Sequence, residues 1–579
     1  MAPTQKKNSR EKDKLSVALQ QIKSYFFYAV VFSASVNILM LTPIIYMLQV
    51  YDRVIASGSM STLGMLTILM ILLLAASGSF EWVRSRLLVA ANFRLEKSLR
   101  DAVSRAASQH VLQTGDPGSA GQAMNDLLRL RQFVTGNGVF AFMDAPWTPI
   151  YIFIMFMFHP FFGIGAIVAA VVMIGLALAT QKATSERLLT ANSLSVSASL
   201  SYQASLRNSE VIQGMGMGSN INVANGILYE KASNEQAIAS TIAGRLAAIS
   251  KSTRLIAQSL LLGVGAYLAI NGQISPGLMI AGSLLLGRAL APIDLMVGSW
   301  SGFIEAKNQF TRLQNLLRVY PDDIERMDLP APTGQLSVEN ITVIPPGSQI
   351  AAVRSVGFQI GAGESLGIIG PSAAGKTSLV RAILGVWPLR AGYIRLDGAE
   401  IGQWDRDKLG PYMGYLPQDI ELFDGTIAAN ICRFSKPDSD KIINAARSAG
   451  IHEMILRLPE GYDTIINANA GALSAGQRQK LGLARAIYDD PRLIILDEPN
   501  SNLDDQGERD LLTTLRRIKE SGRTIIIITH RTSILSLVDK LLVMKNGAIA
   551  RMGSKDEVME AISAPQSNVA RLPKKTDNP

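Results

Sequence analysis

The sequence predicts a multi-domain membrane protein in which six membrane-spanning helices precede an α/β domain with a phosphate-binding loop. Three observations predict this fold class. Four long stretches of the 579-residue chain contain no charged side chain, and charged residues make up only 18% of the whole, against about 25% in soluble domains. From Leu336 onward, short β-like runs alternate with helical segments, which is typical of an α/β domain. A glycine-rich loop follows one of these runs.

The charge-free stretches locate the membrane spans, because a spanning helix needs about 20 apolar residues. They lie between Lys23 and Asp52, Arg53 and Glu81, Asp144 and Lys182, and Arg254 and Arg288. The third is long enough for two helices, with a turn signal at His159-Pro160. Large buried core helices are the alternative, which the run lengths disfavour. We therefore expect six spans, at 25–49, 60–82, 139–158, 161–181, 255–271 and 276–298.

Lysine and arginine predict the orientation of these spans. Basic residues are concentrated in the first 24 residues and in the long segments after the second and fourth spans, whereas the opposite loops are short. Because basic residues mark cytoplasmic loops, we expect both termini and both long loops in the cytoplasm. The long loops are rich in helix formers, so the spans should continue as helical hairpins with tips near 113–120 and 207–219.

Composition predicts the remaining domain boundaries. Residues 320–334 carry three prolines and four acidic residues, which indicates a linker, and the last residues are polar and contain proline. The predicted divisions are a cytoplasmic N-terminal segment (1–24), a six-helix transmembrane domain (25–319), a linker (320–334), a nucleotide-binding domain (335–561) and a flexible tail (562–579).

Several classes of protein do not fit the composition. Cys432 is the single cysteine, so an intrachain disulfide framework and a thiolate zinc cluster are both excluded. The net charge of +9 could indicate nucleic-acid binding. However, the basic residues follow the membrane boundaries, and the sequence has no platform of alternating aromatic and basic residues. We therefore expect no nucleic acid among the partners.

The glycine-rich loop matches the Walker A pattern G-x-x-x-x-G-K-[ST] in its expected context of strand, loop and helix. SLGII (365–369) reads as the strand, and a helical stretch follows the loop. Glycines allow backbone N–H groups to surround phosphates at a helix N-terminus. Lys376 can reach the β- and γ-phosphates, and Thr377 can bind Mg²⁺. The predicted ATP-binding residues of this segment are Gly370, Pro371, Ser372, Ala373, Ala374, Gly375, Lys376, Thr377 and Ser378.

Two further apolar strands end in residues that suit phosphate chemistry. LIIL (493–496) is followed by Asp497, which can hold Mg²⁺, and by Glu498, which is placed to polarise the attacking water as a general base. Ile525–Ile528 is followed by Thr529 and His530. Ligands of α/β folds bind at the carboxyl ends of strands. His530 alone would more often be structural, but beside the other motifs it reads as part of the site.

The ordered set of motifs resembles the nucleotide-binding domain of ATP-binding-cassette (ABC) transporters over about residues 335–560. LSAGQ (Leu473–Gln477) resembles the signature motif, Gln418 in YLPQD the Q-loop, SNLD (Ser501–Asp504) the D-loop, and His530 the switch histidine. One departure concerns adenine, because Pro345 stands where these domains usually carry a stacking aromatic. We expect Pro345, with Ile344, to contact the base.

The resemblance implies two such domains that enclose two ATP molecules with Mg²⁺. The signature residues of one subunit would close over the phosphates held by the other. It assigns ATP contacts to Gln418, Ser474, Gly476, Gln477 and Asp504. It assigns catalysis to Glu498, His530 and Lys376. It assigns the Mg²⁺ ligands as Thr377, Gln418 and Asp497.

Five segments look more specific and resemble type I secretion ATPases, especially exporters of metalloproteases, lipases and repeats-in-toxin proteins. These segments are YMLQVYDRV (46–54), DAPWTPIY (144–151), YLPQDIELFDGTIAANI (415–431), LSAGQRQ (473–479) and EPNSNLD (498–504). The resemblance implies a homodimeric half-transporter in the bacterial inner membrane. It also implies a periplasmic membrane-fusion adaptor, a TolC-like outer-membrane channel, and a protein cargo with an uncleaved C-terminal signal.

Charged residues within the predicted spans are candidates for the translocation path, since intramembrane charges are costly and usually face a cavity or a partner. They are Arg288, Asp144 and Asp294. An ion pair of Arg288 with either aspartate is an equally good interpretation. At the level of function, the alternatives are an ABC exporter of lipid, drug or peptide, and a non-transporting ABC protein that regulates a partner, which the intact Glu498 and His530 disfavour.

Overall fold

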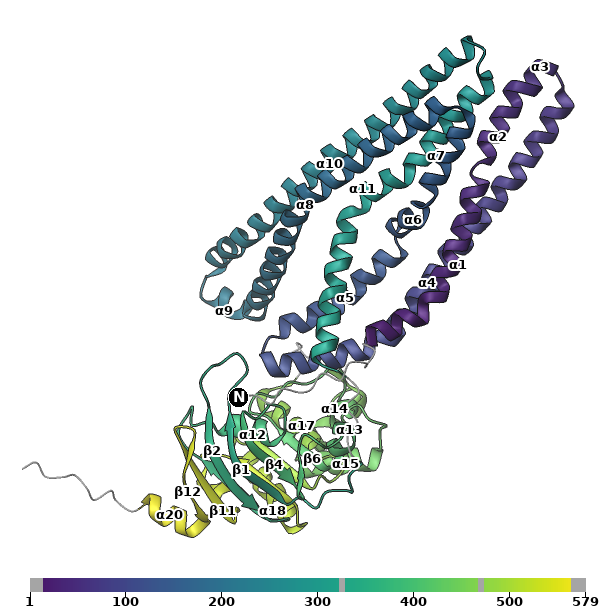
Figure 1. The fold of residues 1–579 in the computed structure, drawn as a ribbon. Helices are drawn as coiled ribbons and strands as arrows, with labels where there is room; N and C mark the ends of the chain where they lie inside the picture. The colour runs from purple at the N-terminus through teal and green to yellow at the C-terminus, as the bar shows by residue number, and fades with distance from the viewer. Residues whose placement is uncertain (1–13, 322–327, 467–472, 564–579) are drawn as a thin grey trace, which may run out of the picture. The chain divides into compact units, whose positions relative to one another are not determined.

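The computed structural model describes residues 14–321, 328–466 and 473–563 (Figure 1). The chain divides into two compact units between Asp322 and Asp323, within the segment predicted as a linker. We call residues up to 322 the membrane unit and the remainder the nucleotide unit; Leu112–Gly115 group with the latter.

Long helices make up the membrane unit. In chain order they are α1 (Lys14–Leu39), α2 (Thr42–Gln49), a π-helical turn (Val50–Val54), α3 (Ile55–Ser57), α4 (Met60–Thr114), α5 (Pro117–Thr135), α6 (Asn137–Asp144), α7 (Trp147–Phe158), α8 (Pro160–Arg207), α9 (Ser209–Gly214), α10 (Gly218–Ile270) and α11 (Pro276–Val319). Among the described residues, five helical segments are long and apolar enough to cross a membrane, or six if the bent pair α6–α7 is one span.

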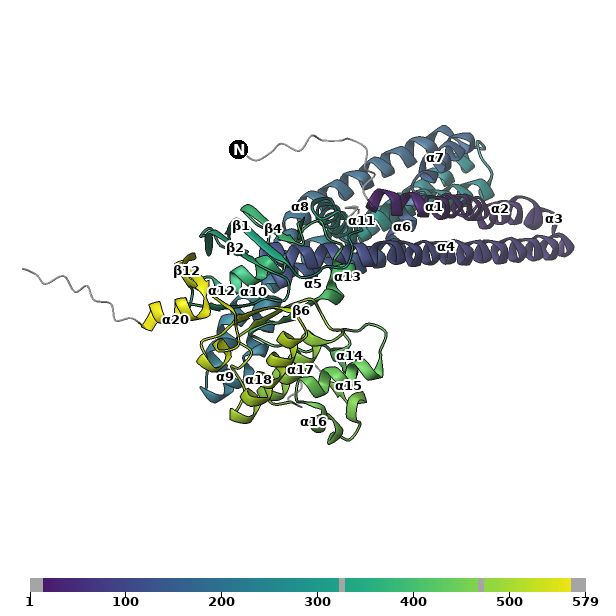
Figure 2. The ribbon, with the colours of Figure 1, turned by 90° about the horizontal axis from the view of Figure 1, so that it is seen from below.

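The helices extend far beyond the predicted apolar spans. α4 has 55 residues, which corresponds to roughly 80 Å at 1.5 Å per residue, whereas the hydrocarbon core of a bilayer is about 30 Å thick. α8 and α10 are similarly long and run side by side (Figures 1 and 2). α4 ends at Thr114 and α8 at Arg207, so the chain turns where the hairpin tips are predicted.

Two predicted spans are not single helices. The span predicted at 139–158 breaks between α6 and α7, which are bent by 45°. Pro146 lies in this break. Proline lacks a backbone N–H, and its ring clashes with the preceding turn of a helix. The span predicted at 25–49 begins earlier, at Lys14, and is interrupted at Met40 and Leu41, just before Pro43 at the start of α2.

The nucleotide unit is built on two main sheets. A four-stranded sheet has the order β2-β1-β4-β5, and a six-stranded sheet has the order β12-β11-β3-β10-β9-β6, in which only β12 is antiparallel to its neighbour. A short pair, β7-β8, completes the set. The strands are β1 (Leu336–Val343), β2 (Val353–Ile360), β3 (Ser365–Ile369), β4 (Ala391–Leu396), β5 (Ala399–Glu400), β6 (Met413–Leu416), β7 (Gly425–Thr426), β8 (Ile465–Ile466), β9 (Leu493–Asp497), β10 (Thr524–Ile528), β11 (Lys540–Lys545) and β12 (Ala548–Ser554).

Every residue of the central strands β9 and β10 is buried. Continuous apolar runs such as LIIL and TIIII suit parallel strands that are covered on both faces. The helices of the unit are α12 (Lys376–Ile383), α13 (Arg406–Leu409), α14 (Ile427–Ile431), α15 (Ser439–Ser448), α16 (His452–Leu456), α17 (Ala475–Ile487), α18 (Asp505–Glu520), α19 (Thr532–Leu535) and α20 (Lys555–Ser563), with short 3-10 turns at Gly410–Tyr412 and Gly461–Asp463.

Candidate functional site

The three predicted site strands are neighbours in the six-stranded sheet. β10 lies between β3 and β9 and is parallel to both, with Ile528 paired with Ile368 and with Asp497. Parallel strands present their carboxyl ends at one edge of the sheet, where α/β folds bind ligands. The glycine-rich loop, Asp497, Glu498 and His530 therefore meet at a single edge.

The glycine-rich loop has a backbone that only glycine accommodates at two points. Gly370 has φ +153° and Gly375 has φ +94°, and a Cβ at these positions would overlap the carbonyl oxygens of Met544 and Ala352. The Nζ of Lys376 donates to the carbonyls of Gly370 and Pro371 at 2.6 and 3.0 Å. The lysine is only 8% exposed, so its charge is held over the centre of the loop, where an incoming phosphate can replace the carbonyls as its partner.

Asp497 is a buried carboxylate without a full set of partners. It is 1% exposed, it is hydrogen-bonded to Thr377, and its Oδ2 has no hydrogen-bond partner among the described residues. Burial raises the pKa of Asp497 above its ordinary value, and the neighbouring Glu498 carboxylate raises it further. A buried oxygen of this kind fits a hard cation. One carboxylate and one hydroxyl, completed by phosphate and water, form the kind of ligand set that Mg²⁺ accepts.

Glu498 lies at a strained backbone position that the surrounding residues stabilise. Its φ is +50°, in the left-handed region, which costs a non-glycine residue about 1–3 kcal/mol. Its N–H donates to the carbonyl of Ile528 at 2.9 Å. The Nε2 of Gln418 donates to its Oε2 at 3.1 Å, and the Nε2 of His530 lies 3.9 Å from its Oε1. The structure thus brings together the predicted base, the Q-loop glutamine and the switch histidine.

Gln479 is a site residue that was not predicted. It is 2% exposed. Its Nε2 donates to the carbonyl of Glu498 at 3.2 Å and to Ser501 Oγ at 3.4 Å, and its Oε1 accepts from the N–H of Asn502 at 2.9 Å. One amide therefore joins the signature helix α17 to the segment after Glu498. Gln479 is the last residue of LSAGQRQ, so the segment marks its position but not its contacts.

The remaining predicted ATP contacts occupy helix caps and turns. Ser474 caps α17 in a reciprocal capping box with Gln477, and Gly476 lies where a Cβ would come within 2.9 Å of the carbonyl oxygen of Asn502. Asp504 caps α18 by accepting from the N–H of Gly507 at 2.8 Å. Pro345 is half-buried in the turn after β1, where its carbonyl accepts from the N–H of Ser348.

The intramembrane charges do not form the ion pair considered for Arg288. Asp144 accepts hydrogen bonds from Ser33, from Asn37 at 2.8 Å and from Arg84 at 3.1 Å, and so ties α6 to α1 and α4. Asp294 pairs instead with Arg254 at 3.3 Å. Arg288 is exposed on α11 and has no ion pair or hydrogen bond with another described residue. These partners come from helices remote in sequence, which a charge pattern alone cannot rank.

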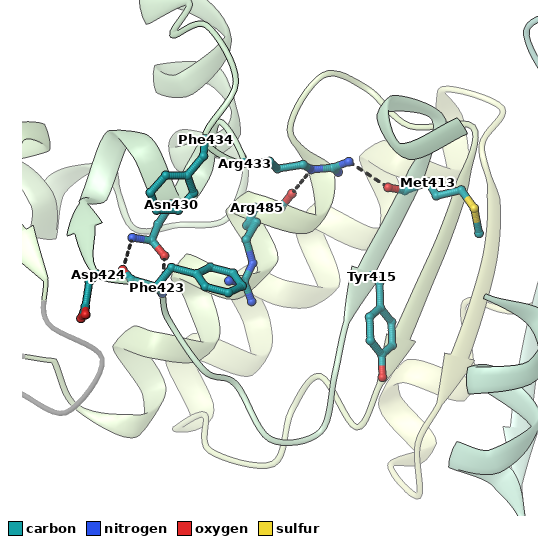
Figure 3. A pocket seen from close by; sticks show the side chains of 8 residues that line it. All are labelled: Met413, Tyr415, Phe423, Asp424, Asn430, Arg433, Phe434 and Arg485. Carbon is teal, nitrogen blue, oxygen red and sulfur yellow. Dashed lines mark hydrogen bonds between the residues drawn. The ribbon is translucent and has the colours of Figure 1, made fainter. Parts of the chain in front are cut away.

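A separate cavity of about 670 Å³ lies in the nucleotide unit, beside β6 (Figure 3). The exposed rings of Phe423 and Phe434 meet edge to face, with centroids 5.9 Å apart. Arg433 forms part of its wall and donates to backbone carbonyls that include those of Met413 and Arg485 at 2.9 and 3.0 Å. Burial lowers the pKa of Arg433, and the nearby charge of Asp489 offsets this only in part. This framework of carbonyl bonds fixes the loop that presents the two rings.

Asp497→Asn should stabilise the nucleotide-free protein and abolish its further stabilisation by MgATP. At pH 7 the unfolded chain carries a solvated carboxylate that folding must bury. The raised pKa of Asp497 means that this cost shrinks as the pH falls toward the ordinary carboxyl range. The midpoint temperature of thermal unfolding should therefore be higher for the variant than for the wild type. The expected increase is roughly 2–4 °C for each kcal/mol gained in the free energy of unfolding. The difference should be larger at pH 8 than at pH 5. Equal midpoints in calorimetry at pH 8 would contradict this account.

Comparisons with known proteins show which family the chain is similar to. Residues 353–501 match the family model described as "ABC transporter". The type I secretion system ATP-binding protein PrsD of Rhizobium meliloti is 42% identical over 95% of both chains. The cyclolysin secretion/processing ATP-binding protein CyaB of Bordetella pertussis is 27% identical over 90% of this chain and 74% of its own. In fold, the chain is similar to a bacterial Atm1-family ABC exporter with ATP bound, with a TM-score of 0.76 and 20% identity over 95% of this chain and 97% of the other. With this sequence identity over nearly its whole length, the chain belongs to the type I secretion ABC transporters, which couple ATP hydrolysis to the export of proteins.

Proposed function

We propose that two copies of this chain form an inner-membrane exporter that moves a protein cargo with an uncleaved C-terminal signal out of the cytoplasm. The observation that carries this proposal is the meeting of Lys376, Asp497, Glu498 and His530 at one sheet edge, in a chain with only five or six candidate spans among its described residues. One such chain supplies one ATP-binding edge and half of the helices of a two-domain exporter. The PrsD likeness supports a protein as the cargo.

The chemistry of the site assigns a role to each side chain. Lys376 and the backbone of the glycine-rich loop bind the phosphates, and Ser474, Gly476 and Gln477 of the second copy cover them. Thr377, Asp497 and Gln418 would hold Mg²⁺, which would supply positive charge to neutralise the phosphates. Glu498 accepts a proton from the attacking water, and His530 orients the γ-phosphate beside it. Pro345 and Ile344 contact adenine.

The system around the exporter follows from its class. We place the chain in the bacterial inner membrane with both termini in the cytoplasm, consistent with the distribution of basic residues. A periplasmic membrane-fusion adaptor and a TolC-like outer-membrane channel would complete the route for the cargo. ATP-driven closure of the two nucleotide units would reach the helices through the hairpin tips near 113–120 and 207–219.

The proposal is tested by comparing the culture medium of the native host with that of a Lys376→Ala strain by mass spectrometry. One or a few proteins should disappear from the medium of the variant and accumulate in its cells. As a control, the membranes of the two strains must contain equal amounts of the exporter. An unchanged set of secreted proteins, under conditions where the exporter is expressed, would refute a protein cargo and favour export of a lipid, drug or peptide.

Phe423→Ser should uncouple ATP hydrolysis from secretion. Phe423 is 59% exposed at the cavity of Figure 3, where its ring meets the ring of Phe434 and the guanidinium of Arg485. We expect secretion of the cargo to fall by at least about tenfold, equivalent to 1.4 kcal/mol, while ATP hydrolysis stays within about twofold, since an exposed ring away from the nucleotide contributes little to its binding. Tyr393→Ser, at an aromatic on β4 that is 50% exposed, is the control. Parallel losses of hydrolysis and secretion would contradict this expectation.

A further inference from the structure

A polar cavity of about 290 Å³ lies within the membrane unit, between α5, α8 and α11. Its lining comes from the parts of α8 and α11 that extend beyond the apolar spans predicted from the sequence. Amides, hydroxyls and guanidiniums predominate in the lining. Among the described lining residues, Val196 and Leu200 supply the apolar side chains, and none of them carries an aromatic ring. This composition differs from the apolar and aromatic lining usual for small-molecule pockets.

Two polar stripes face this cavity. On α8, Asn192, Ser195, Ser199 and Gln203 recur every three or four residues, so they lie along one face of the helix. The stripe covers roughly 16 Å at 1.5 Å per residue, which is the length of about five residues of extended chain. On α5, the lining residues Gln122, Asn125 and Arg129 have the same spacing. The site is therefore elongated rather than compact.

Gln309 on α11 indicates that the cavity receives a ligand. It is 5% exposed and lines the cavity. Its amide makes no hydrogen bond with any described residue. The amide faces the cavity rather than a protein partner. It can therefore both donate a hydrogen bond to a ligand and accept one from it.

The cavity wall contains an ion pair between Asp126 and Arg312, and it also contains Arg129, which has no ion pair with a described residue. Asp126 on α5 is 5% exposed and accepts two hydrogen bonds from Arg312 on α11, at 2.6 and 2.7 Å. The same pair lines an adjoining cavity of about 330 Å³, so the two cavities share this wall. Arg129 is exposed and has no ion pair with a described residue. It leaves one positive charge available to a carboxylate of the ligand.

We propose that this cavity binds an extended segment of the exported polypeptide, an inference that rests on the proposed function. Amide and hydroxyl side chains both donate and accept hydrogen bonds, so the two stripes match the alternating N–H and C=O groups of an extended backbone whatever its sequence. The small volume admits a chain segment and excludes a folded domain. A lipid would find few apolar partners here.

The test compares Ser195 with Ser197, two exposed serines on α8 of which only Ser195 lines the cavity. Ser195→Trp should lower secretion of the cargo at least tenfold, while Ser197→Trp leaves it unchanged. ATP hydrolysis without cargo should be equal in both variants. In parallel, a benzophenone photocrosslinker placed at position 195, but not at 197, should capture in living cells the same protein that the Lys376→Ala strain retains.

Each other outcome overturns the assignment. Normal secretion by Ser195→Trp would refute the site, and so would a crosslink to a second copy of this chain or to a lipid. Those results leave the proposed function intact if the Lys376→Ala strain still retains its cargo. If no protein depends on Lys376 for its secretion, the proposed function itself fails, and this inference fails with it. Gln309→Met, nearly isosteric but unable to form hydrogen bonds, should reduce secretion about fivefold, the equivalent of one lost hydrogen bond.

Discussion

Glu498→Gln should lower steady-state ATP hydrolysis by about 10²–10⁴-fold, the usual contribution of a general base, without preventing ATP binding. The amide keeps the size of the side chain but cannot accept the proton of the attacking water. The hydrogen bond from Gln418 and the approach of His530 at 3.9 Å involve the two carboxylate oxygens, and the amide retains one of these oxygens. The variant should therefore bind ATP, close and remain closed.

Hydrolysis is measured as phosphate release by the detergent-solubilised full chain, and closure as ATP retained on the protein after gel filtration. Glu453→Gln on α16, an exposed glutamate outside the ATP-binding edge, is the matched control and should turn over ATP normally. Near-normal turnover by the Glu498 variant would refute its role as the base. Loss of ATP binding would instead show that the carboxylate is required to hold its neighbours in place.

The sequence was most informative where a function requires a fixed order of residues along the chain. The strand predicted at 365–369 has those bounds in the structure. Asp497 is the last residue of a fully buried strand, one residue beyond the predicted end, and Glu498 follows it. The ABC exporter fold is confirmed by the structural comparison. A phosphate-binding loop needs glycine at positions such as Gly370 and Gly375, where a Cβ would overlap a neighbouring carbonyl. Such local requirements remain visible in a single sequence.

Features that depend on tertiary packing could not be predicted. Asp144 pairs with Arg84, 60 residues away, and Asp294 with Arg254 rather than with Arg288. Spacing along the chain does not rank these partners, because the choice depends on which helix faces pack together. Gln479 was missed for a related reason. Its role depends on the proximity of the carbonyl of Glu498, which only the folded chain reveals. Pro146 was a local signal for the break between α6 and α7. We nevertheless predicted a single span at 139–158 because the sequence there is mostly apolar.

Lys376→Ala should abolish ATP hydrolysis and secretion by removing the charge that binds the phosphates. A hydrogen bond to a charged group contributes about 1.5–3 kcal/mol, so ATP affinity should fall by roughly 10–100-fold. The same Nζ bonds to the carbonyls of Gly370 and Pro371, so the substitution also removes support from the loop. Binding of a fluorescent ATP analogue to the full chain measures the first effect.

A control must separate the loss of charge from loosening of the loop. Lys376→Arg keeps the positive charge and its hydrogen-bonding capacity but places a planar, bulkier group at a site that is 8% exposed. Lys436→Ala removes an exposed lysine outside the site and should change nothing. If Lys376→Ala unfolds at the temperature of the wild type but no longer binds ATP, the lysine acts on the phosphates directly. Retained hydrolysis in Lys376→Ala would mean that the backbone N–H groups of the loop hold the phosphates by themselves, and the role assigned to Lys376 would be wrong.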